Sequence, residues 1–218
     1  MTETDVAAVG VVLAGGLSRR MDGREKAFLP LAGKPLIRHV LDRITPKVAA
    51  LAINANGDPA RFGEFGLPVI TDTIPGYAGP LAGILAGMRW AQERHPQGTH
   101  IVTAAADTPF FPADLAERLP SAAQGDRPTI AIAISDGHRH PVFGCWPVAL
   151  ADDLEAFLHS GEGGKVMLFA HNYPIVDVPF VEVSIGGAKI DPFFNINTPA
   201  DLETARAIAE GASHAAGA

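Results

Sequence analysis

The first 119 residues alternate between short apolar segments and stretches with the apolar spacing of helices. Four apolar segments are predicted as buried strands that each end in glycine or polar residues: 9–13, 48–53, 67–71 and 100–106. Helical spacing is found at 35–44, 80–93 and 109–119. Repeated strand-then-helix units are typical of a parallel sheet with helices on both faces. We therefore predict an α/β fold with three layers around an open, mostly parallel sheet.

The pattern changes after residue 119. Residues 129–135 and 142–146 are predicted as the two strands of a hairpin, joined by the six residues 136–141. The remaining predicted elements are helices at 148–160, 165–171 and 199–210 and a small antiparallel strand pair at 175–178 and 180–185. We expect one domain over residues 1–211, followed by a disordered tail at 212–218.

A turn rich in glycine and positive charge follows the first predicted strand. Gly15 and Gly16 leave backbone N–H groups uncovered by side chains, and Arg19, Arg20, Arg24 and Lys26 come directly after them. In a chain of net charge −7, this concentration of cations indicates a phosphate site. The alternative is a solvated loop between a strand and a helix. The spacing fits neither the G-x-G-x-x-G dinucleotide fingerprint nor a Walker A loop.

Polar residues also end the other predicted strands. Asn54, Asp72 and Asp107 are expected to lie beside Gly15, because carboxyl ends of parallel strands share one edge of the sheet. An amide such as that of Asn54 can recognise a nucleobase or ribose, or it can simply form a turn. Asp107 is either a ligand for Mg²⁺ or the N-cap of the predicted helix at 109–119.

Two histidines lie within the predicted hairpin turn. His138 and His140 flank Arg139 and could form part of a metal site, but no third ligand has an obvious place. A solvated or anion-contacting turn is the interpretation we favour.

Composition narrows the functional classes. The single cysteine, Cys145, excludes an intramolecular disulfide framework. Positive charge is local rather than spread in a stripe, which argues against nucleic acid as a partner. The acidic N-terminus and the lack of a long apolar run predict a cytoplasmic protein without a membrane anchor. We expect a monomer.

Taken together, these motifs resemble molybdenum cofactor guanylyltransferases, a family of nucleotidyltransferases. The resemblance extends from Leu13 to Leu202. It is carried by Leu13-Ala-Gly-Gly16, Arg19-Arg-Met21, Lys26, Gly33-Lys-Pro-Leu36, Asn54-Ala-Asn56, Asp72, Gly79-Pro-Leu-Ala-Gly83, Asp107-Thr-Pro109, His140-Pro141 and Asn195-Ile-Asn-Thr-Pro199.

The resemblance implies a fold like that of nucleotide-diphospho-sugar transferases, with a small antiparallel addition in the C-terminal half. It implies a GTP-binding half at 1–119 and a pterin or acceptor half at 120–211. The implied GTP-binding residues are Leu13, Ala14, Gly15, Gly16, Lys26, Asn54, Asp72 and Asp107, and the implied catalytic residues are Arg19, Lys26 and Asp107. Asp107 would bind Mg²⁺. The residues implied on the pterin or metal side are Gly79, Gly83, His140, Asn195 and Asn197.

The implied reaction transfers GMP from GTP to the terminal phosphate of molybdopterin or the molybdenum cofactor and releases pyrophosphate. Transient contacts with molybdenum-insertion proteins and acceptor molybdoenzymes are also implied. A cytidylyltransferase acting on the same or a related phosphate acceptor is one alternative. A nucleotide sensor or cofactor carrier without transfer activity is an alternative from another class.

Overall fold

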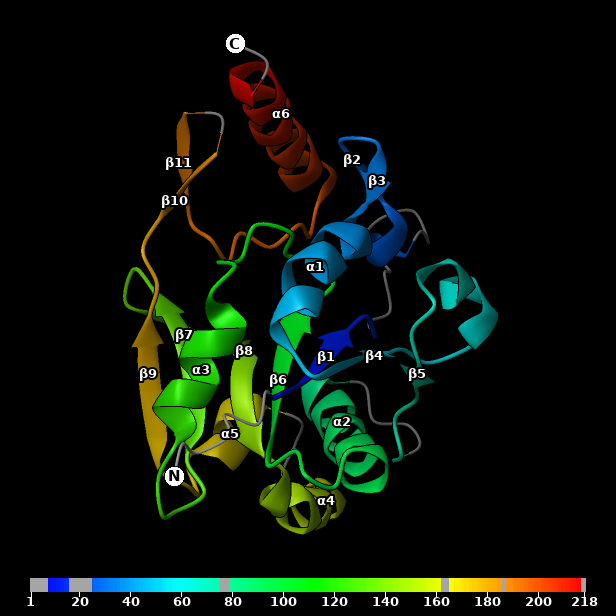
Figure 1. Ribbon diagram of the computed structural model, residues 1–218, viewed down its shortest axis with the longest axis vertical. Helices are drawn as coiled ribbons and strands as arrows, with labels where there is room; N and C mark the ends of the chain where they lie inside the picture. Colours follow the sequence, from blue (N-terminus) through cyan, green and yellow to red (C-terminus); the bar gives the residue numbers. More distant parts are fainter. Residues whose placement is uncertain (1–7, 16–24, 75–78, 162–164, 186, 217–218) are drawn as a thin grey trace.

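A seven-stranded sheet forms the centre of the computed structural model, which describes residues 8–15, 25–74, 79–161, 165–185 and 187–216 (Figure 1). The strand order is β5-β4-β1-β6-β8-β7-β9. These strands are β1 (Val9–Leu13), β4 (Ala50–Asn54), β5 (Val69–Ile70), β6 (His100–Ala105), β7 (Ile130–Ser135), β8 (His138–Pro147) and β9 (Ile175–Pro179). Only β8 runs against the other strands of this sheet. The prediction of a mostly parallel sheet is confirmed.

Helices cover both faces of the sheet (Figure 1). On one face lie α1 (Leu36–Ile44) and α3 (Leu115–Ala123), and on the other lie α2 (Pro80–Arg94), α4 (Ala151–His159) and α5 (Val166–Ala170). Successive side chains of a strand point to opposite faces. In β1, Val12 therefore packs in the core between the sheet and α1 and α3, and Val11 packs in the core on the other face, with α2, α4 and α5. The three predicted layers are therefore present.

Glycines let α2 approach the sheet closely. A Cβ atom at Gly87 would lie 2.7 Å from Val11 Cγ2, and one at Gly83 would lie 2.3 Å from Asn54 Oδ1. Both distances are shorter than real Cβ contacts, so a larger residue would push the helix away from β1 and β4. Gly83 thus places α2 directly against a predicted site residue.

The remaining elements lie around this core. Two short antiparallel sheets are formed by β2 (Pro30–Leu31) with β3 (Lys34–Pro35), and by β10 (Val183–Ile185) with β11 (Ala188–Ile190). Short 3-10 helices are η1 (Lys26–Phe28), η2 (Thr45–Lys47), η3 (Pro59–Phe65) and η4 (Val148–Leu150). Helix α6 (Pro199–Ala216) lies beyond the carboxyl edge of the sheet and packs on β2 and β10 (Figure 1).

The predicted hairpin is present, but its turn is shorter. Strand β8 begins at His138, so only Asp136 and Gly137 lie in the turn. Both have positive φ angles, 46° and 73°, as a two-residue hairpin turn of the Asp-Gly type requires. The predicted antiparallel pair is placed wrongly. Strand β9 pairs in parallel with β7, and the small antiparallel addition is β10 with β11.

The helix predicted at 109–119 begins only at Leu115. Pro109 and Pro112 lack a backbone N–H, and the side chains of Phe110 and Phe111 are buried, so the chain stays irregular there. Asp107 is therefore not the cap of this helix. The alternative that assigned it a capping role is wrong.

The disordered tail expected at 212–218 stays a prediction. Helix α6 continues to Ala216, and residues 217–218 lie outside the described residues. Gly211 costs a helix only about 1 kcal/mol relative to alanine, and the alanines around it favour helix. The division into one domain with two functional halves stays a prediction.

Candidate active site

Backbone hydrogen bonds join the ends of β1, β4 and β6. The N–H of Ala14 donates to the carbonyl of Asn54 at 2.8 Å, and the N–H of Ala106 donates to the carbonyl of Leu13 at 3.0 Å. Gly15 is exposed and lies against the Asn54 side chain. The strand ends that carry the predicted residues therefore share one edge, as the parallel sheet predicted.

Lys26 lies between two oxygen atoms from distant parts of the chain. Its Nζ donates to Asp107 Oδ2 at 3.4 Å and makes a short hydrogen bond to Asn197 Oδ1. The side chains of Lys26 and Asp107 are only 22% and 21% exposed. We call these three residues the lysine cluster. It brings together a predicted phosphate ligand, the predicted metal ligand and Asn197, which the resemblance implied on the pterin or metal side and which is 171 positions from Lys26.

The environment of Asp107 disfavours its ionised form. Burial raises the pKa of this carboxyl group, and the nearby Lys26 ammonium opposes that change only in part. A partly buried carboxylate that one cation does not fully compensate is suited to bind a second cation. Asp107 and Asn197 already place two hard oxygen donors around one positive charge, so the residues present fit a divalent ion.

The start of α6 holds Asn197 in place. Thr198 and Asp201 form a reciprocal cap, in which Asp201 Oδ2 accepts the N–H groups of Asn197 and Thr198 at 2.9 and 2.8 Å. These donors, first that of Asn197, lower the pKa of Asp201. The main chain before Asn197 is fixed as well, because the N–H of Ile196 donates to the carbonyl of Asp107 at 3.0 Å.

Lys26 itself sits on a short turn that neighbouring side chains secure. Glu25 forms an ion pair with Arg61, and the Arg61 guanidinium lies over the rings of Phe28 and Phe62, 5.8 Å from each centroid. The Glu25 side chain is thus tied to η3, which anchors the residue before Lys26.

A second polar group lies at the ends of β4 and β5. Asn54 Nδ2 donates to Asp72 Oδ1 at 3.0 Å, Asn56 Nδ2 donates to Asp72 Oδ2 at 2.7 Å, and the Asp72 N–H donates back to Asn56 Oδ1 at 3.1 Å. Asn54 is 3% exposed. We call Asn54, Asn56 and Asp72 the amide cluster. In this cluster, both carboxylate oxygens of Asp72 accept hydrogen bonds from neutral side-chain amides.

Other predicted residues are placed less centrally. Gly79 is the N-cap of α2, and Gly83 faces Leu13 and Asn54, so its contacts are with predicted GTP-binding residues rather than with an acceptor side. Asn195 is exposed in the segment before α6. Gly16 and Arg19 lie outside the described residues.

His140 belongs to a network that the sequence did not indicate. Its Nε2 lies 2.6 Å from Ser135 Oγ, and that hydroxyl donates to Asp191 Oδ1 at 2.8 Å. The His140 ring stacks on Phe193, with centroids 4.4 Å apart. Burial lowers the pKa of His140, which favours the neutral ring. Ser135 and Asp191 were missed because their 56-residue separation leaves no local pattern.

The described residues contain no group of three or more His, Cys, Asp or Glu side chains arranged to hold a metal. The interpretation of His138 and His140 as a metal pair therefore has no support in this part of the chain. Among the helices that the structure describes, none has the length and apolar character of a membrane span.

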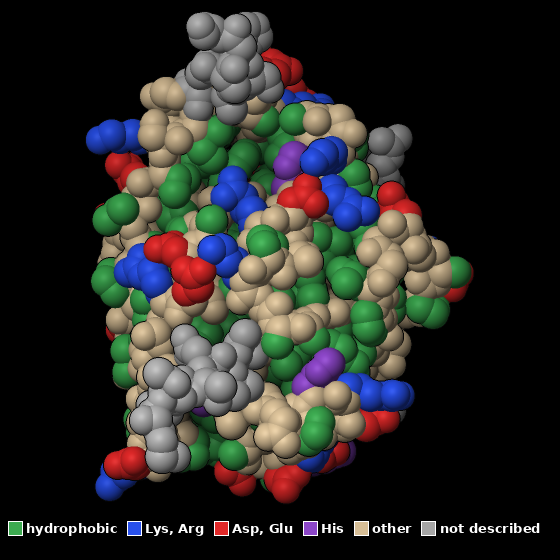
Figure 2. Space-filling view, in the orientation of Figure 1, with side chains coloured by type: hydrophobic (Ala, Val, Ile, Leu, Met, Phe, Trp, Pro, Cys, Tyr) green, Lys and Arg blue, Asp and Glu red, His purple; other side chains and the backbone are tan. Residues whose placement is uncertain are grey.

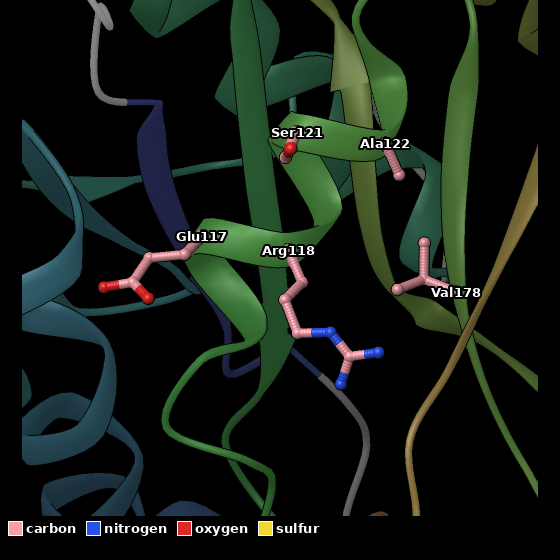
Figure 3. Close-up of a pocket in the computed structure, with 5 residues that line it drawn as sticks. All are labelled: Glu117, Arg118, Ser121, Ala122 and Val178. Atoms are coloured by element: carbon pink, nitrogen blue, oxygen red, sulfur yellow. The ribbon is translucent and has the colours of Figure 1, made fainter.

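A shallow groove of about 430 Å³ between α3 and β9 lies apart from these clusters (Figure 3). Its lining is Glu117, Arg118, Ser121, Ala122 and Val178. Arg118 is engaged by the Pro179 carbonyl and the Phe180 ring, and Glu117 by Lys47. On the face shown in Figure 2, cationic and anionic side chains lie next to one another rather than in separate patches.

A mostly parallel α/β sheet with Gly15, Lys26 and Asp107 at the carboxyl ends of its strands fits a nucleotidyltransferase of the α/β class. The model of the MobA-like NTP transferase domain matches residues 10–175. The chain belongs to this family, and the resemblance seen in the sequence is confirmed.

Similar proteins agree over nearly the whole chain. A molybdenum cofactor guanylyltransferase of Rhizobium meliloti (strain 1021) is 49% identical over 90% of this chain and 89% of its own length. One from Bradyrhizobium sp. (strain ORS 278) is 45% identical over 95% of this chain and 96% of its own. The crystal structure of molybdopterin-guanine dinucleotide biosynthesis protein A from Archaeoglobus fulgidus is 27% identical, with a TM-score of 0.69 over 93% of this chain and 98% of its own.

Proposed function

We propose that this protein transfers the GMP group of GTP to the terminal phosphate of molybdopterin or its molybdenum form. An acceptor phosphate oxygen forms a bond to the α-phosphorus of GTP, and the bond from that phosphorus to the β-phosphate oxygen breaks. The products are a guanine dinucleotide form of the cofactor and pyrophosphate. No proton has to be removed from the nucleophile, which is already an anion.

One observation carries the proposal: the lysine cluster and the amide cluster lie at the same edge of the sheet as Gly15. A nucleotide needs a polar contact for its nucleoside and a cationic one for its phosphates. The amide cluster suits the first need and the lysine cluster the second. The names of relatives 45% to 49% identical over nearly the whole chain support guanosine as the nucleoside and the pterin as the acceptor.

The residues at this edge would act mainly on charge and alignment. The Lys26 ammonium would move from Asp107 and Asn197 to the phosphate oxygens and stabilise charge on the departing pyrophosphate. Gly15 is exposed, and its backbone N–H would be a further donor to the phosphates. Asn54 and Asp72 would keep the nucleoside in place, so that the acceptor meets the α-phosphorus from a fixed direction.

Asp107, with Asn197 beside it, would hold Mg²⁺. When bound, the ion would supply positive charge that screens the repulsion between the two phosphate substrates. Asp107 would be ionised in that state, since the cation opposes the increase in pKa that burial causes.

The test is to incubate the purified chain with GTP, Mg²⁺ and molybdopterin, then to measure pyrophosphate and identify the product by mass spectrometry. We expect a guanine dinucleotide and one pyrophosphate per product, both lost when EDTA is added. Reaction with CTP in place of GTP would favour the cytidylyltransferase alternative. Nucleotide binding without pyrophosphate release would identify a sensor or carrier.

A further inference from the structure

Residues 191–198, which we call the strap, run from β11 to α6. One end is tied to Ser135, at the end of β7, through Asp191. The other end is tied to Asp107, just after β6, through the N–H of Ile196. Strand β8 lies between β7 and β6 in the sheet. The strap therefore passes across three neighbouring strands, on the side of the sheet where β6 and β7 have their carboxyl ends.

The strap ends at the lysine cluster. Asn197 is its seventh residue and contacts Lys26 directly. Two sets of contacts place its side chain against Lys26: the cap at the start of α6, which accepts the Asn197 N–H, and the contacts of the strap residues before it. Within the strap, the buried side chains of Phe193 and Ile196 hold the main chain by packing, and Asp191 holds it by hydrogen bonds.

The polar contacts define a directed chain of hydrogen bonds. Asp191 Oδ1 accepts the Ser135 hydroxyl at 2.8 Å and the Phe193 N–H at 2.9 Å. A serine has one hydroxyl proton, so the 2.6 Å contact must be a donation from His140 Nε2 to Ser135 Oγ. Ser135 is 5% exposed, which makes loss of this partner costly.

We infer that Ser135 is a positioning residue for the transfer reaction: through Asp191 it holds the strap so that Asn197 and Asp107 stay aligned with Lys26. This inference rests on the proposed function for its kinetic part. Its structural part, that Ser135 orders the strap, stands independently of any substrate.

The kinetic test is a double-mutant cycle between Ser135→Ala and Asn197→Ala. If Ser135 acts through Asn197, Ser135→Ala lowers kcat about 10-fold in the natural chain but less than about 2-fold when Asn197 is already alanine. The KM for GTP should stay close to that of the natural chain in both backgrounds, because the amide cluster is untouched. Equal effects of Ser135→Ala in the two backgrounds would overturn the inference.

Two further variants separate positioning from a general loss of stability. Asp191→Asn keeps an oxygen acceptor for Ser135 and for the Phe193 N–H, so we expect kcat within about 2-fold of the natural chain. Asp191→Ala removes the acceptor and should lower kcat about as much as Ser135→Ala. Equal losses in Asp191→Asn and Asp191→Ala would contradict the hydrogen-bonding role. Ser121→Ala, an exposed position on α3, is the matched control and should leave kcat unchanged.

The structural part is tested by hydrogen–deuterium exchange of peptides that cover 191–198, measured without substrates. Ser135→Ala should speed exchange at the amides of Phe193 and Ile196 about 10-fold, and Ser121→Ala should not. Unchanged exchange would refute the inference that Ser135 orders the strap. Faster exchange in a protein that makes no guanine dinucleotide would refute the proposed function alone.

Discussion

The amide cluster and the lysine cluster lie at the same edge of the sheet but balance charge in different ways. In the amide cluster, neutral amides of Asn54 and Asn56 hold the single Asp72 carboxylate on both oxygens. In the lysine cluster, the Lys26 ammonium contacts Asp107 at 3.4 Å and burial still raises the pKa of that carboxyl group. In the amide cluster, both oxygens of Asp72 accept hydrogen bonds from the protein. In the lysine cluster, Lys26 offsets only part of the cost of burying the Asp107 carboxylate.

This difference indicates that the two clusters contribute differently to the proposed reaction. Under the proposed function, the neutral hydrogen bonds around the buried Asn54 would stay in place when the nucleoside binds and would therefore suit its recognition. Under the proposed function, the ion pair of Lys26 and Asp107 would open when phosphates and a cation bind, and it would therefore suit the reacting end. Variants in the two clusters should accordingly change different kinetic parameters.

The largest effect is expected at Asp107. Asp107→Ala removes the carboxylate that fits a divalent ion, and kcat should fall at least about 10³-fold. Pyrophosphate release at saturating Mg²⁺ measures the effect, and Asp126→Ala, at an exposed position, is the control. Turnover close to that of the natural chain would rule out the metal role of Asp107 and leave the contrast between the clusters without its strongest support.

Lys26 is expected to show opposite effects on catalysis and on metal binding. Lys26→Met should lower kcat about 10²- to 10³-fold, because it removes a preorganised cation from the departing phosphates. In the free protein the same variant should bind Mn²⁺ about 10-fold more tightly, because the ammonium no longer competes for Asp107 and Asn197.

Mn²⁺ binding to Lys26→Met is measured by electron paramagnetic resonance without nucleotide. The double variant Lys26→Met/Asp107→Ala is the control and should bind no Mn²⁺ at this edge. Weaker Mn²⁺ binding in Lys26→Met than in the natural chain would show that the Lys26 ammonium does not compete with the ion for Asp107 and Asn197.

In the amide cluster, the change should appear in KM instead. Asn54→Ala leaves Asp72 Oδ1 without its donor and should raise the KM for GTP about 10-fold, with kcat within about 2-fold of the natural chain. Asn56→Ala is the matched control: it removes an exposed donor to the same carboxylate and should change KM less. A fall in kcat as large as that of Lys26→Met would erase the distinction between the clusters.

Sequence patterns predicted the parts of this edge that depend on local order. The C-terminal ends of β1, β4 and β6 fall within one residue of their predicted positions, and parallel pairing then places Gly15, Asn54 and Asp107 on one edge. Periodicity and strand ends reveal this much because both are properties of neighbouring residues.

Contacts between distant residues could not be predicted in this way. Only the family resemblance implied Asn197, on the pterin or metal side, because its contact with Lys26 spans 171 positions and leaves no periodic signal. The contact between Ser135 and Asp191 spans 56 positions and was missed altogether. The parallel pairing of β9 with β7 was missed for the same reason. The start of α3 was misjudged because a capping aspartate and a ligand aspartate look alike until the prolines and buried phenylalanines after Asp107 are placed in space.

The smallest expected effect concerns stability and distinguishes the two carboxylates directly. Burial raises the pKa of Asp107 in the folded protein, so the native state binds a proton more tightly than the unfolded state. The ionised carboxylate therefore lowers the free energy of unfolding as pH rises from its ordinary pKa through the raised one. Asp107→Asn should raise Tm by about 2 °C at pH 7, and this gain should disappear near pH 3. Asp72→Asn, in which satisfied hydrogen bonds are lost, should lower Tm at pH 7 instead. Thermal unfolding of both variants at the two pH values measures this difference, and a lower Tm for Asp107→Asn at pH 7 would show that Lys26 fully compensates the buried charge.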